Sequence, residues 1–307
     1  MGRVIVARPN GFCFGVERAL RLARAGLKKF PRVYTFGQLV HNPRVLQELA
    51  AAGIKPVRRL VDVRNGCLVI RAHGCPARVL EECARQGIAV IDATCPYVRR
   101  VQNVARKLSA DGYQVVVVGE RNHPEVKAIL AAAGKGARVF SPGLRLQGRI
   151  GLVAQTTISR EMLKEAVAKL LDFRYTEIRV FDTVCAEVVA RQESAVRLAQ
   201  MVDAVVVVGG KNSANTRRLT DIIRAQGKPV EHITGAEELD LRRWRGYKRI
   251  GVVAGASTPA SAVAEIARIL DNSGCVLPGT RSRCGVARSK LRRDRVLRRS
   301  DTNDRRY

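Results

Sequence analysis

The sequence predicts an α/β protein built from three pseudo-equivalent modules, each a small parallel sheet flanked by helices. Short apolar runs, typical of strands buried on both faces, alternate along the chain with segments in which apolar residues recur at three- and four-residue steps, as in amphipathic helices. This alternation is repeated three times, and a cysteine stands at the same point of each repeat. The 307 residues, of which 46% are hydrophobic, suffice for two or three domain cores.

Each repeat is marked by a cysteine between an apolar run and a helical pattern. In the first repeat the apolar run is Val4–Val6. In the second, Ile88–Ile91 is followed by a polar turn and by Pro96, which suits the first position of a helix because it lacks an N–H. The same order of strand, turn, cysteine and helix occurs at Cys13, Cys95 and Cys185. The positive end of the helix dipole favours a thiolate at such a place.

Two further strands follow each cysteine, and polar residues stand where they end. The residues after the first of these strands, at the same distance from each cysteine, are His41, His123 and Ser213. The residues after the second are His73, Thr156 and Ser257. In parallel sheets ligands bind beyond the carboxyl ends of the strands, so we expect these residues to face a ligand.

The repeats divide the chain into four parts. We expect a first α/β module in residues 1–95, a second in 96–184, a third in 185–275 and a basic tail in 276–307. Three modules around a pseudo-threefold axis form a trefoil whose strand ends all point to one centre. The tail has no apolar periodicity and several arginine pairs, which is typical of a disordered basic arm.

Composition limits the partners and the compartment. The net charge of +28 favours anionic partners: a phosphate ligand, an acidic protein or nucleic acid. An aromatic content of 5% makes nucleic acid an unlikely ligand of the modules, because single strands stack on aromatic side chains. No apolar run reaches membrane-spanning length and the N-terminus has no signal-peptide core, so we expect no membrane partner and a cytoplasmic protein with reduced cysteines.

Cysteines at three equivalent strand ends favour a shared metal site over inert buried thiols, although one such cysteine alone would not. Zinc sites usually have paired Cys-x-x-Cys spacing, which does not occur here. Three thiolates on a four-iron–four-sulfur cluster would leave one iron open to substrate. The other cysteines have no equivalents in the repeat: Cys67, Cys75, Cys83, Cys275 and Cys284.

Imidazole, hydroxyl and amide donors at helix N-termini suit a phosphate or diphosphate. The candidates are His41, His73, His123, Thr156, Ser213, Asn215 and Ser257. For the hydroxyl and amide members, helix N-capping is the alternative, and for each histidine a structural role. Glu125 stands in the first turn of a helix, where it either complements the dipole or, with a raised pKa, delivers protons; the spacing leaves both open.

These residues lie in motifs that follow one another along the chain. The motifs are Gly11-Phe12-Cys13, Val40-His41-Asn42, Ala72-His73-Gly74, Asp92-Ala93-Thr94-Cys95-Pro96, His123-Pro124-Glu125, Gln155-Thr156-Thr157, Arg191-Gln192 and Gly255-Ala256-Ser257. In this order, over roughly Val4 to Leu270, the chain resembles the 4-hydroxy-3-methylbut-2-enyl diphosphate reductase family of the methylerythritol phosphate route to isoprenoids.

The resemblance implies a trefoil around one four-iron–four-sulfur cluster held by Cys13, Cys95 and Cys185. It implies reductive dehydroxylation of an allylic diphosphate to isopentenyl and dimethylallyl diphosphates, with single electrons from ferredoxin or flavodoxin, whose acidity suits the basic chain. Glu125 would relay protons and Thr156 would position the hydroxyl group. The diphosphate would be bound by His41, His73, His123, Ser213, Asn215 and Ser257.

Two segments depart from the family pattern. Ala214 stands where the family usually has a second serine, and the run Ala186–Ala190 replaces typical threonines and brings the carboxylate of Glu187 towards the anion site. Two alternatives remain: a redox-neutral hydro-lyase that uses the open iron as a Lewis acid, and a catalytically impaired homologue whose basic tail binds nucleic acid.

Overall fold

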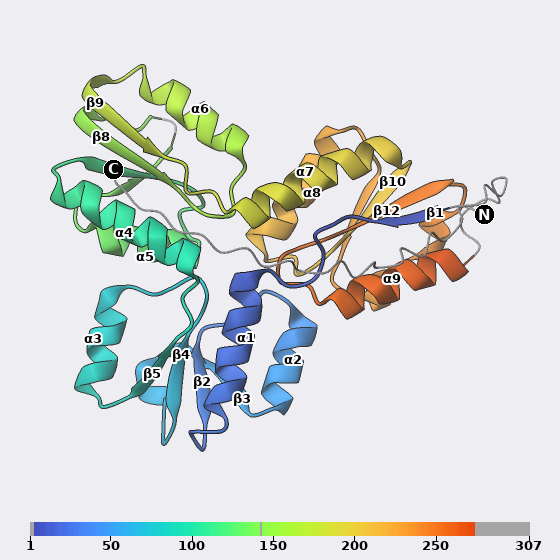
Figure 1. Cartoon of the computed structure of the whole chain (residues 1–307), viewed down its shortest axis with the longest axis horizontal. Helices are drawn as coiled ribbons and strands as arrows, with labels where there is room; N and C mark the ends of the chain where they lie inside the picture. Colours follow the sequence, from blue (N-terminus) through green and yellow to red (C-terminus); the bar gives the residue numbers. More distant parts are fainter. Residues whose placement is uncertain (1–2, 142, 274–307) are drawn as a thin grey trace, which may run out of the picture.

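The computed structural model describes residues 3–141 and 143–273, which form three lobes around a common centre (Figure 1). Each lobe contains a four-stranded, all-parallel sheet with helices packed against it. The predicted α/β class and the three similar modules are therefore confirmed. The predicted basic tail, residues 276–307, lies outside the described residues.

The strand order is equivalent in the three sheets: β3-β2-β4-β5, β7-β6-β8-β9 and β11-β10-β12-β1. Neighbouring strands pair in parallel, with Val206 opposite Val252 in the third sheet, for example. The strands are β1 (Arg3–Val6), β2 (Val33–Phe36), β3 (Ile54–Val57), β4 (Cys67–Ile70), β5 (Ala89–Asp92), β6 (Gln114–Val118), β7 (Arg138–Val139), β8 (Gln147–Ala154), β9 (Arg174–Phe181), β10 (Ala204–Val208), β11 (Val230–Ile233) and β12 (Arg249–Ala254).

Two helices cover one face of each sheet and a third covers the other. They are α1 (Phe14–Gly26), α2 (Pro43–Ala51), α3 (Ala77–Arg85), α4 (Pro96–Ala110), α5 (Pro124–Ala133), α6 (Arg160–Leu170), α7 (Ala186–Met201), α8 (Ala214–Ala225) and α9 (Ala260–Asn272), with short 3₁₀ turns η1 (Leu60–Asp62), η2 (Ala236–Glu238) and η3 (Leu241–Trp244). None of the helices within the described ranges is long and apolar enough to cross a membrane.

Each sheet has an apolar core on both faces, because alternate side chains of a strand point to opposite sides. In the third module Val206 and Val252 pack towards α9, while Val205 and Val253 pack towards α7 and α8. The first and second modules repeat this arrangement. Burial on both faces explains why the central strands read as continuous apolar runs rather than alternating ones.

The chain passes from one sheet to the next at each cysteine. The strand before Cys95 is β5, the last strand of the first sheet, and the helix after it, α4, packs in the second module. Likewise β9 of the second sheet leads through Cys185 to α7 of the third module. The strand before Cys13, β1, pairs with β12 of the third sheet. The three cysteines therefore lie at the three crossings between modules.

Two details of the strand assignment differ from the sequence-based expectation. The run Val4–Val6 was expected in the first module, but it forms β1, which is an edge strand of the third sheet. In each of the three sheets, therefore, one edge strand is the strand that precedes a cysteine. The sheets also have four strands rather than about three, since β3, β7 and β11 are short, partly polar edge strands without a continuous apolar run. Division of the chain into domains at residues 95/96 and 184/185 stays a proposal.

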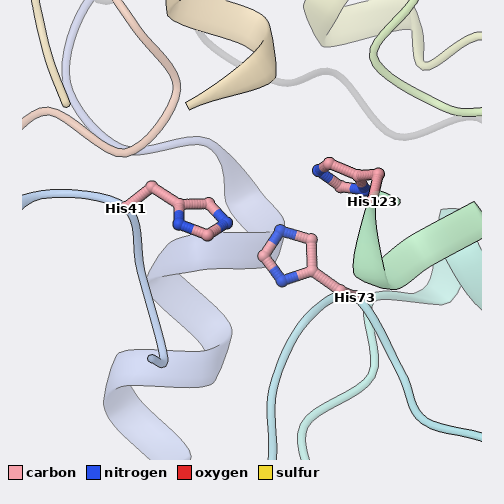
Figure 2. Close-up of side chains that lie close together, drawn as sticks. All are labelled: His41, His73 and His123. Carbon is pink, nitrogen blue, oxygen red and sulfur yellow. The ribbon is translucent and has the colours of Figure 1, made fainter. Parts of the chain in front are cut away.

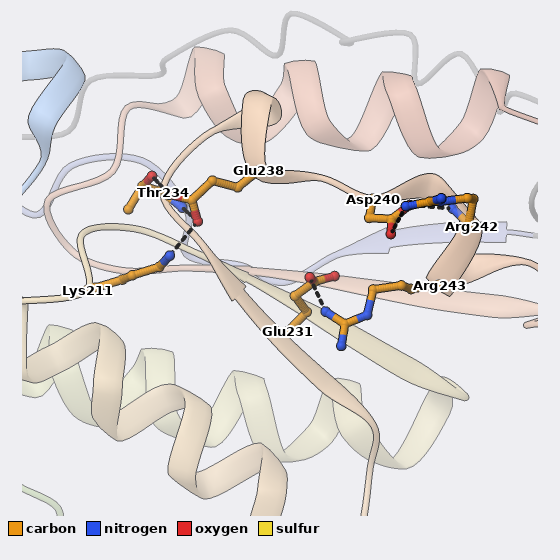
Figure 3. Close-up of polar contacts among 7 residues, drawn as sticks. All are labelled: Lys211, Glu231, Thr234, Glu238, Asp240, Arg242 and Arg243. Atoms are coloured by element: carbon orange, nitrogen blue, oxygen red, sulfur yellow. Dashed lines mark hydrogen bonds and ion pairs between the residues drawn. The ribbon is translucent and has the colours of Figure 1, made fainter.

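After β11 the chain forms η2 and η3, which pack on the face of the third sheet that α9 covers. Trp244 is buried in the core there. Ion pairs tie the segment to its surroundings: Lys211 to Glu238 at 2.7 Å and Arg243 to Glu231 at 2.6 Å (Figure 3). These contacts hold the segment against the core of the third module.

We predict that Thr183 fastens the end of β9 to β8. Its buried hydroxyl donates to the carbonyl of Ala154 at 2.7 Å and accepts the N–H of Ala154 at 2.8 Å. Thr183→Val leaves both backbone groups unpaired and should lower the free energy of unfolding by about 2 kcal/mol. The exposed Thr176→Val, within β9, is the control and should change it by less than about 0.5 kcal/mol. Equal urea midpoints for the two variants would contradict this role.

Candidate functional site

A central pocket lies where the carboxyl ends of the three sheets meet. Every residue proposed from the sequence for the cluster, the anion and proton transfer lines this one pocket. Its walls come from all three modules: Cys13, His41, His73, Cys95, His123, Glu125, Thr156, Cys185, Ser213, Asn215 and Ser257. The convergence inferred from the repeat is therefore observed, although the role of each residue stays a prediction.

The three cysteines occupy equivalent positions, each as the N-cap residue of a helix (α1, α4 and α7). The backbone N–H of each cysteine donates to a carbonyl in the loop after the strand that lies beside its own preceding strand in the same sheet: β12 beside β1, β4 beside β5 and β8 beside β9. The acceptors are Ala256 for Cys13 (2.9 Å), Ala72 for Cys95 (3.0 Å) and Thr156 for Cys185 (2.9 Å). All three thiols line the same pocket, and none of them is in a disulfide.

Gly15 allows the first two cysteines to approach each other. A Cβ atom at this position would lie 2.8 Å from Sγ of Cys95 and 3.9 Å from Sγ of Cys13, so any side chain here would enter the space between the thiols. Burial raises the pKa of Cys13, Cys95 and Cys185, and the N–H groups of the helix starts only partly oppose it. Burial therefore outweighs the preference for a thiolate that was expected from the helix dipole. A bound cation would lower the pKa of the thiols again and favour the thiolate.

Three histidines line the same pocket, and their rings lie close together (Figure 2). The ring of His73 lies 5.2 Å from that of His41 and 5.3 Å from that of His123, measured between centroids. Burial lowers the pKa of His41 and of His123 to about 4, helped by the positive charges of Arg71 and Arg217. Burial also lowers the pKa of His73 well below its ordinary value. All three rings are therefore neutral at pH 7.

The hydrogen bond of His123 indicates whether these rings suit a cation or an anion. The nearest ring nitrogens lie within 4.8 Å of one another, which would allow a shared metal ion. However, Nδ1 of His123 accepts the backbone N–H of Glu125 at 3.2 Å, so the neutral ring carries its proton on Nε2 and donates from there. A metal ion bound to Nε2 would force the proton of the neutral ring onto Nδ1. There it would point at the N–H of Glu125, and the hydrogen bond would be lost. The arrangement thus favours an anion.

Buried polar atoms without partners lie beside the histidines. They include Nδ1 of His41 and of His73, both side-chain polar atoms of Asn215 and the hydroxyl of Ser257. Buried polar groups are almost always hydrogen-bonded, so these atoms indicate a polar ligand. The hydroxyl of Ser213 instead accepts the N–H of Thr216 at 3.4 Å, which is the N-capping alternative. Its own O–H remains free to donate.

Glu125 is fully buried rather than an exposed partner of the helix dipole. Its carboxylate accepts the backbone N–H of Thr156 at 2.7 Å and the hydroxyl of Thr156 at 2.9 Å. Burial raises the pKa of Glu125 to about 7, although both hydrogen bonds act in the opposite direction. A carboxyl group with this pKa can hold and release a proton near neutral pH.

Two arginines were not assigned roles from the sequence. The guanidinium of Arg191, on α7, donates to the carbonyls of Pro9 at 3.3 Å and of Gly11 at 2.9 Å, which fixes the loop that carries Cys13. Arg71 directly follows β4 and lines a separate cavity with Cys75 and Lys127, and its charge helps to lower the pKa of His73. The motif Arg191-Gln192 was visible in the sequence, but an arginine on a helix is usually a surface residue.

The remaining cysteines lie away from the pocket or outside the described residues. Cys67 and Cys83 are buried in the cores of the first module, and Cys75 packs against one of these cores. Cys275 and Cys284 lie beyond residue 273. The carboxylate of Glu187 lies at the cysteine side of the pocket, where it accepts the N–H of Phe14 at 3.1 Å.

Known proteins match nearly the whole described chain. The family described as LytB protein matches residues 4–271. A protein of Geobacter sulfurreducens named 4-hydroxy-3-methylbut-2-enyl diphosphate reductase is 41% identical over 268 residues, which cover 86% of this chain and 95% of that one. A protein of the same name from Aquifex aeolicus is 42% identical over 266 residues, 83% of this chain and 91% of that one.

Two solved structures are similar. One is titled the structure of (E)-4-hydroxy-3-methyl-but-2-enyl diphosphate reductase, the terminal enzyme of the non-mevalonate pathway; it is 38% identical, covers 88% of this chain and 99% of that chain, and has a TM-score of 0.66. The other is the E-1-hydroxy-2-methyl-but-2-enyl-4-diphosphate reductase from Plasmodium falciparum, at 25% identity, 88% coverage of both chains and a TM-score of 0.82.

We predict that the raised pKa of Glu125 makes stability depend on pH. The folded protein keeps this proton up to about pH 7, whereas the unfolded chain releases it near 4.5, so the free energy of unfolding falls as pH rises between these values. Relative to Glu125→Gln, the ligand-free wild type should lose about 3 kcal/mol between about pH 4.5 and pH 8 in urea unfolding. The exposed Glu161→Gln controls for the lost surface carboxylate. A difference in stability between wild type and Glu125→Gln that is constant with pH would refute the assignment.

Proposed function

Because the chain belongs to the LytB protein family, we infer that it is an oxidoreductase that converts (E)-4-hydroxy-3-methylbut-2-enyl diphosphate to isopentenyl and dimethylallyl diphosphates. This is the terminal step of the non-mevalonate route to isoprenoids. The observation that carries the assignment is one pocket lined both by three thiols from equivalent positions and by neutral, unpaired hydrogen-bonding groups.

The thiols fit a four-iron–four-sulfur cluster. Three partly buried cysteines line one pocket, and the missing side chain at Gly15 leaves the space between two of them open. Cys13, Cys95 and Cys185 would hold the cluster, with Arg191 fixing the loop of the first. When bound, such a cluster supplies single electrons and an iron without a protein ligand that can take the hydroxyl oxygen of the substrate.

The histidines and the polar residues near them would bind the diphosphate. Neutral imidazole N–H groups, an amide and hydroxyls can surround an anion without first having to release a counter-ion of their own. These donors are His41, His73, His123, Ser213, Asn215 and Ser257. Donors at the helix starts of α5 and α8 add the positive ends of two helix dipoles.

Glu125 and Thr156 would move and position the proton. Cleavage of the C–O bond consumes two electrons and two protons: one leaves with the hydroxyl as water and one adds to the allylic carbon skeleton. Glu125, with a pKa of about 7, can hold such a proton on its carboxyl group. The hydroxyl of Thr156, 2.9 Å from that carboxyl, is placed to orient the leaving hydroxyl group.

The electrons would come from an acidic one-electron donor such as ferredoxin or flavodoxin. A net charge of +28 attracts such proteins and speeds their encounter at low ionic strength. The alternative in which a basic tail binds nucleic acid concerns residues that the structure does not describe.

The function is tested by anaerobic turnover with and without reductant. We expect reconstituted protein to form both isopentenyl and dimethylallyl diphosphates with dithionite and a mediator, and neither without them. Substrate consumption that does not depend on reductant would instead support the redox-neutral hydro-lyase alternative.

We predict that the cluster depends on three cysteines only. Cys13→Ser, Cys95→Ser and Cys185→Ser should each lose most of the iron and sulfide found in anaerobically prepared wild type, together with its visible absorption. Cys67→Ser, Cys75→Ser and Cys83→Ser are matched controls and should retain both. Wild type that binds no iron, or a control that loses it, would overturn the ligand assignment.

A further inference from the structure

A second cavity lies between α3 of the first module and α5 of the second, which contact each other. It is lined by the end of β2, the loop after β4, the first turn of α3 and one side of α5. It shares no lining residue with the central pocket. The side chains that define this α3–α5 cavity are Phe36, Arg71, Arg78, Val79, Lys127 and Leu130.

The charged residues that line the α3–α5 cavity are all cations, namely Arg71, Arg78 and Lys127, and none of the described carboxylates lines it. Burial raises the pKa of Cys75 to about 12, so its thiol adds no negative charge. Within residues 3–141 and 143–273 none of the three cationic side chains makes a hydrogen bond or an ion pair. A cavity lined by charges of one sign attracts counter-ions, so this cavity favours an anion.

Arg71 is the member of this cluster whose charge is partly removed from water. Its Nε is buried without a partner, whereas Arg78 and Lys127 are exposed. Burial also lowers the pKa of Arg71, as expected for a partly desolvated cation. Its Nη1 lies 3.0 Å from the position that a Cβ of Gly37 would occupy, and Gly37, with φ of 75°, leaves that space free. An unpaired buried charge destabilises a protein unless a ligand compensates it.

The remaining surface of the cavity suits an organic phosphate. The N-cap residue of α3 is Pro76, whose side chain makes no capping hydrogen bond. Ala77, the first residue of that helix, lines the cavity, and the N–H groups of a first turn have no partner within the helix. Phe36, Val79 and Leu130 add apolar surface beside the cations. The cavity therefore combines groups for a phosphate with groups for a hydrocarbon.

We propose that the α3–α5 cavity is a second anion site, which binds the phosphate groups of a small organic phosphate ester. Arg71 would contact the phosphate oxygens at the buried end, and Arg78 and Lys127 would contact them at the rim. The apolar side chains would contact the organic part of the ligand. The site lies outside the pocket of the proposed function and does not depend on that function.

A ligand in this cavity would act on two of the histidines without touching them. In the loop after β4, His73 lines the central pocket and Arg71 lines the α3–α5 cavity. At the start of α5, His123 lines the central pocket and Lys127 lines the α3–α5 cavity. An anion bound by both Arg71 and Lys127 would therefore connect the two segments that carry these histidines and stabilise their positions.

Isothermal titration of anaerobically reconstituted protein with inorganic pyrophosphate tests the site through its stoichiometry. Wild type should bind two pyrophosphate ions per chain, one in each cavity. Lys127→Met and Arg71→Met should weaken one of these binding events at least about tenfold and retain the other, because a charged hydrogen bond is lost in one cavity only. Asn215→Ala, in the central pocket, should weaken the event that they retain. Binding of a single ion by wild type would overturn the proposal.

Lys164→Met is the matched control for net charge. It removes the same charge from an exposed residue of α6 that lines neither cavity, and it should bind both ions within about twofold of wild type. Equal losses in Lys127→Met and Lys164→Met would show that the general surface charge attracts the ion, and the second site would then be refuted.

Thermal unfolding separates a loss of binding from a loss of structure. Removing an unpaired, partly buried charge should leave the Tm of pyrophosphate-free Arg71→Met unchanged or higher, while the rise in Tm on adding pyrophosphate becomes smaller. Arg71→Lys keeps a positive charge and should recover part of that rise. A lower Tm of Arg71→Met with two undiminished binding events would assign Arg71 to packing and contradict its role in binding.

Isopentenyl diphosphate tests the organic part of the ligand. At the site that Lys127→Met weakens, Leu130→Ala should weaken binding of this ester about threefold or more, because less apolar surface is buried, and should leave binding of inorganic pyrophosphate within about twofold. Equal effects on the ester and on the inorganic ion would refute an organic ligand.

Turnover assays separate the second site from the proposed reaction. Wild type that binds two pyrophosphate ions but reduces no substrate would refute the reaction and leave the second site standing. Wild type that reduces its substrate but binds one ion would refute the second site alone.

Discussion

The structure depends on three equivalent backbone hydrogen bonds at its centre. Cys13, Cys95 and Cys185 each donate an N–H to a carbonyl in the loop after the adjacent sheet strand. Each bond is made where the chain leaves one sheet and starts the first helix of the next, so the link between two modules and the position of a thiol are one feature. A shift of one module would move a cysteine, and for this reason the cohesion of the three modules and the geometry of the pocket are coupled.

The pocket disfavours charge on almost every group it contains. Burial raises the pKa of the thiols and of Glu125 and lowers that of the histidines, so the ligand-free site tends towards neutral forms. Water would compete with a substrate for these groups less than it does at a surface, because the site has already given up its solvation. Such a site is preorganised. Folding has already removed water from these polar groups, so a charged ligand meets donors that are fixed in place.

The sequence predicted the central strands and the convergence of the cysteines because both are repeated local patterns: a buried run, a turn and a helix start. It could not predict that β1 pairs with β12, since the partners are far apart in the chain and no local period reports which sheet an edge strand joins. The short β7 has too few residues to show a period at all. Arg71 and Arg191 were missed for a related reason: a sequence shows an arginine, but not whether its charge has a partner.

Glu187 shows how the altered loop after Cys185 still fits the centre. The N–H groups in the first turn of a helix have no partner within it, and the N–H of Phe14 in α1 is one of these. The carboxylate of Glu187, itself in the first turn of α7, accepts that N–H at 3.1 Å. One negative charge therefore lies near the positive ends of two helices, α1 and α7. It links the segment after Cys185 to the segment after Cys13. This position also keeps the carboxylate beside the cysteines, so it ties two modules together and leaves the histidines available to an anion.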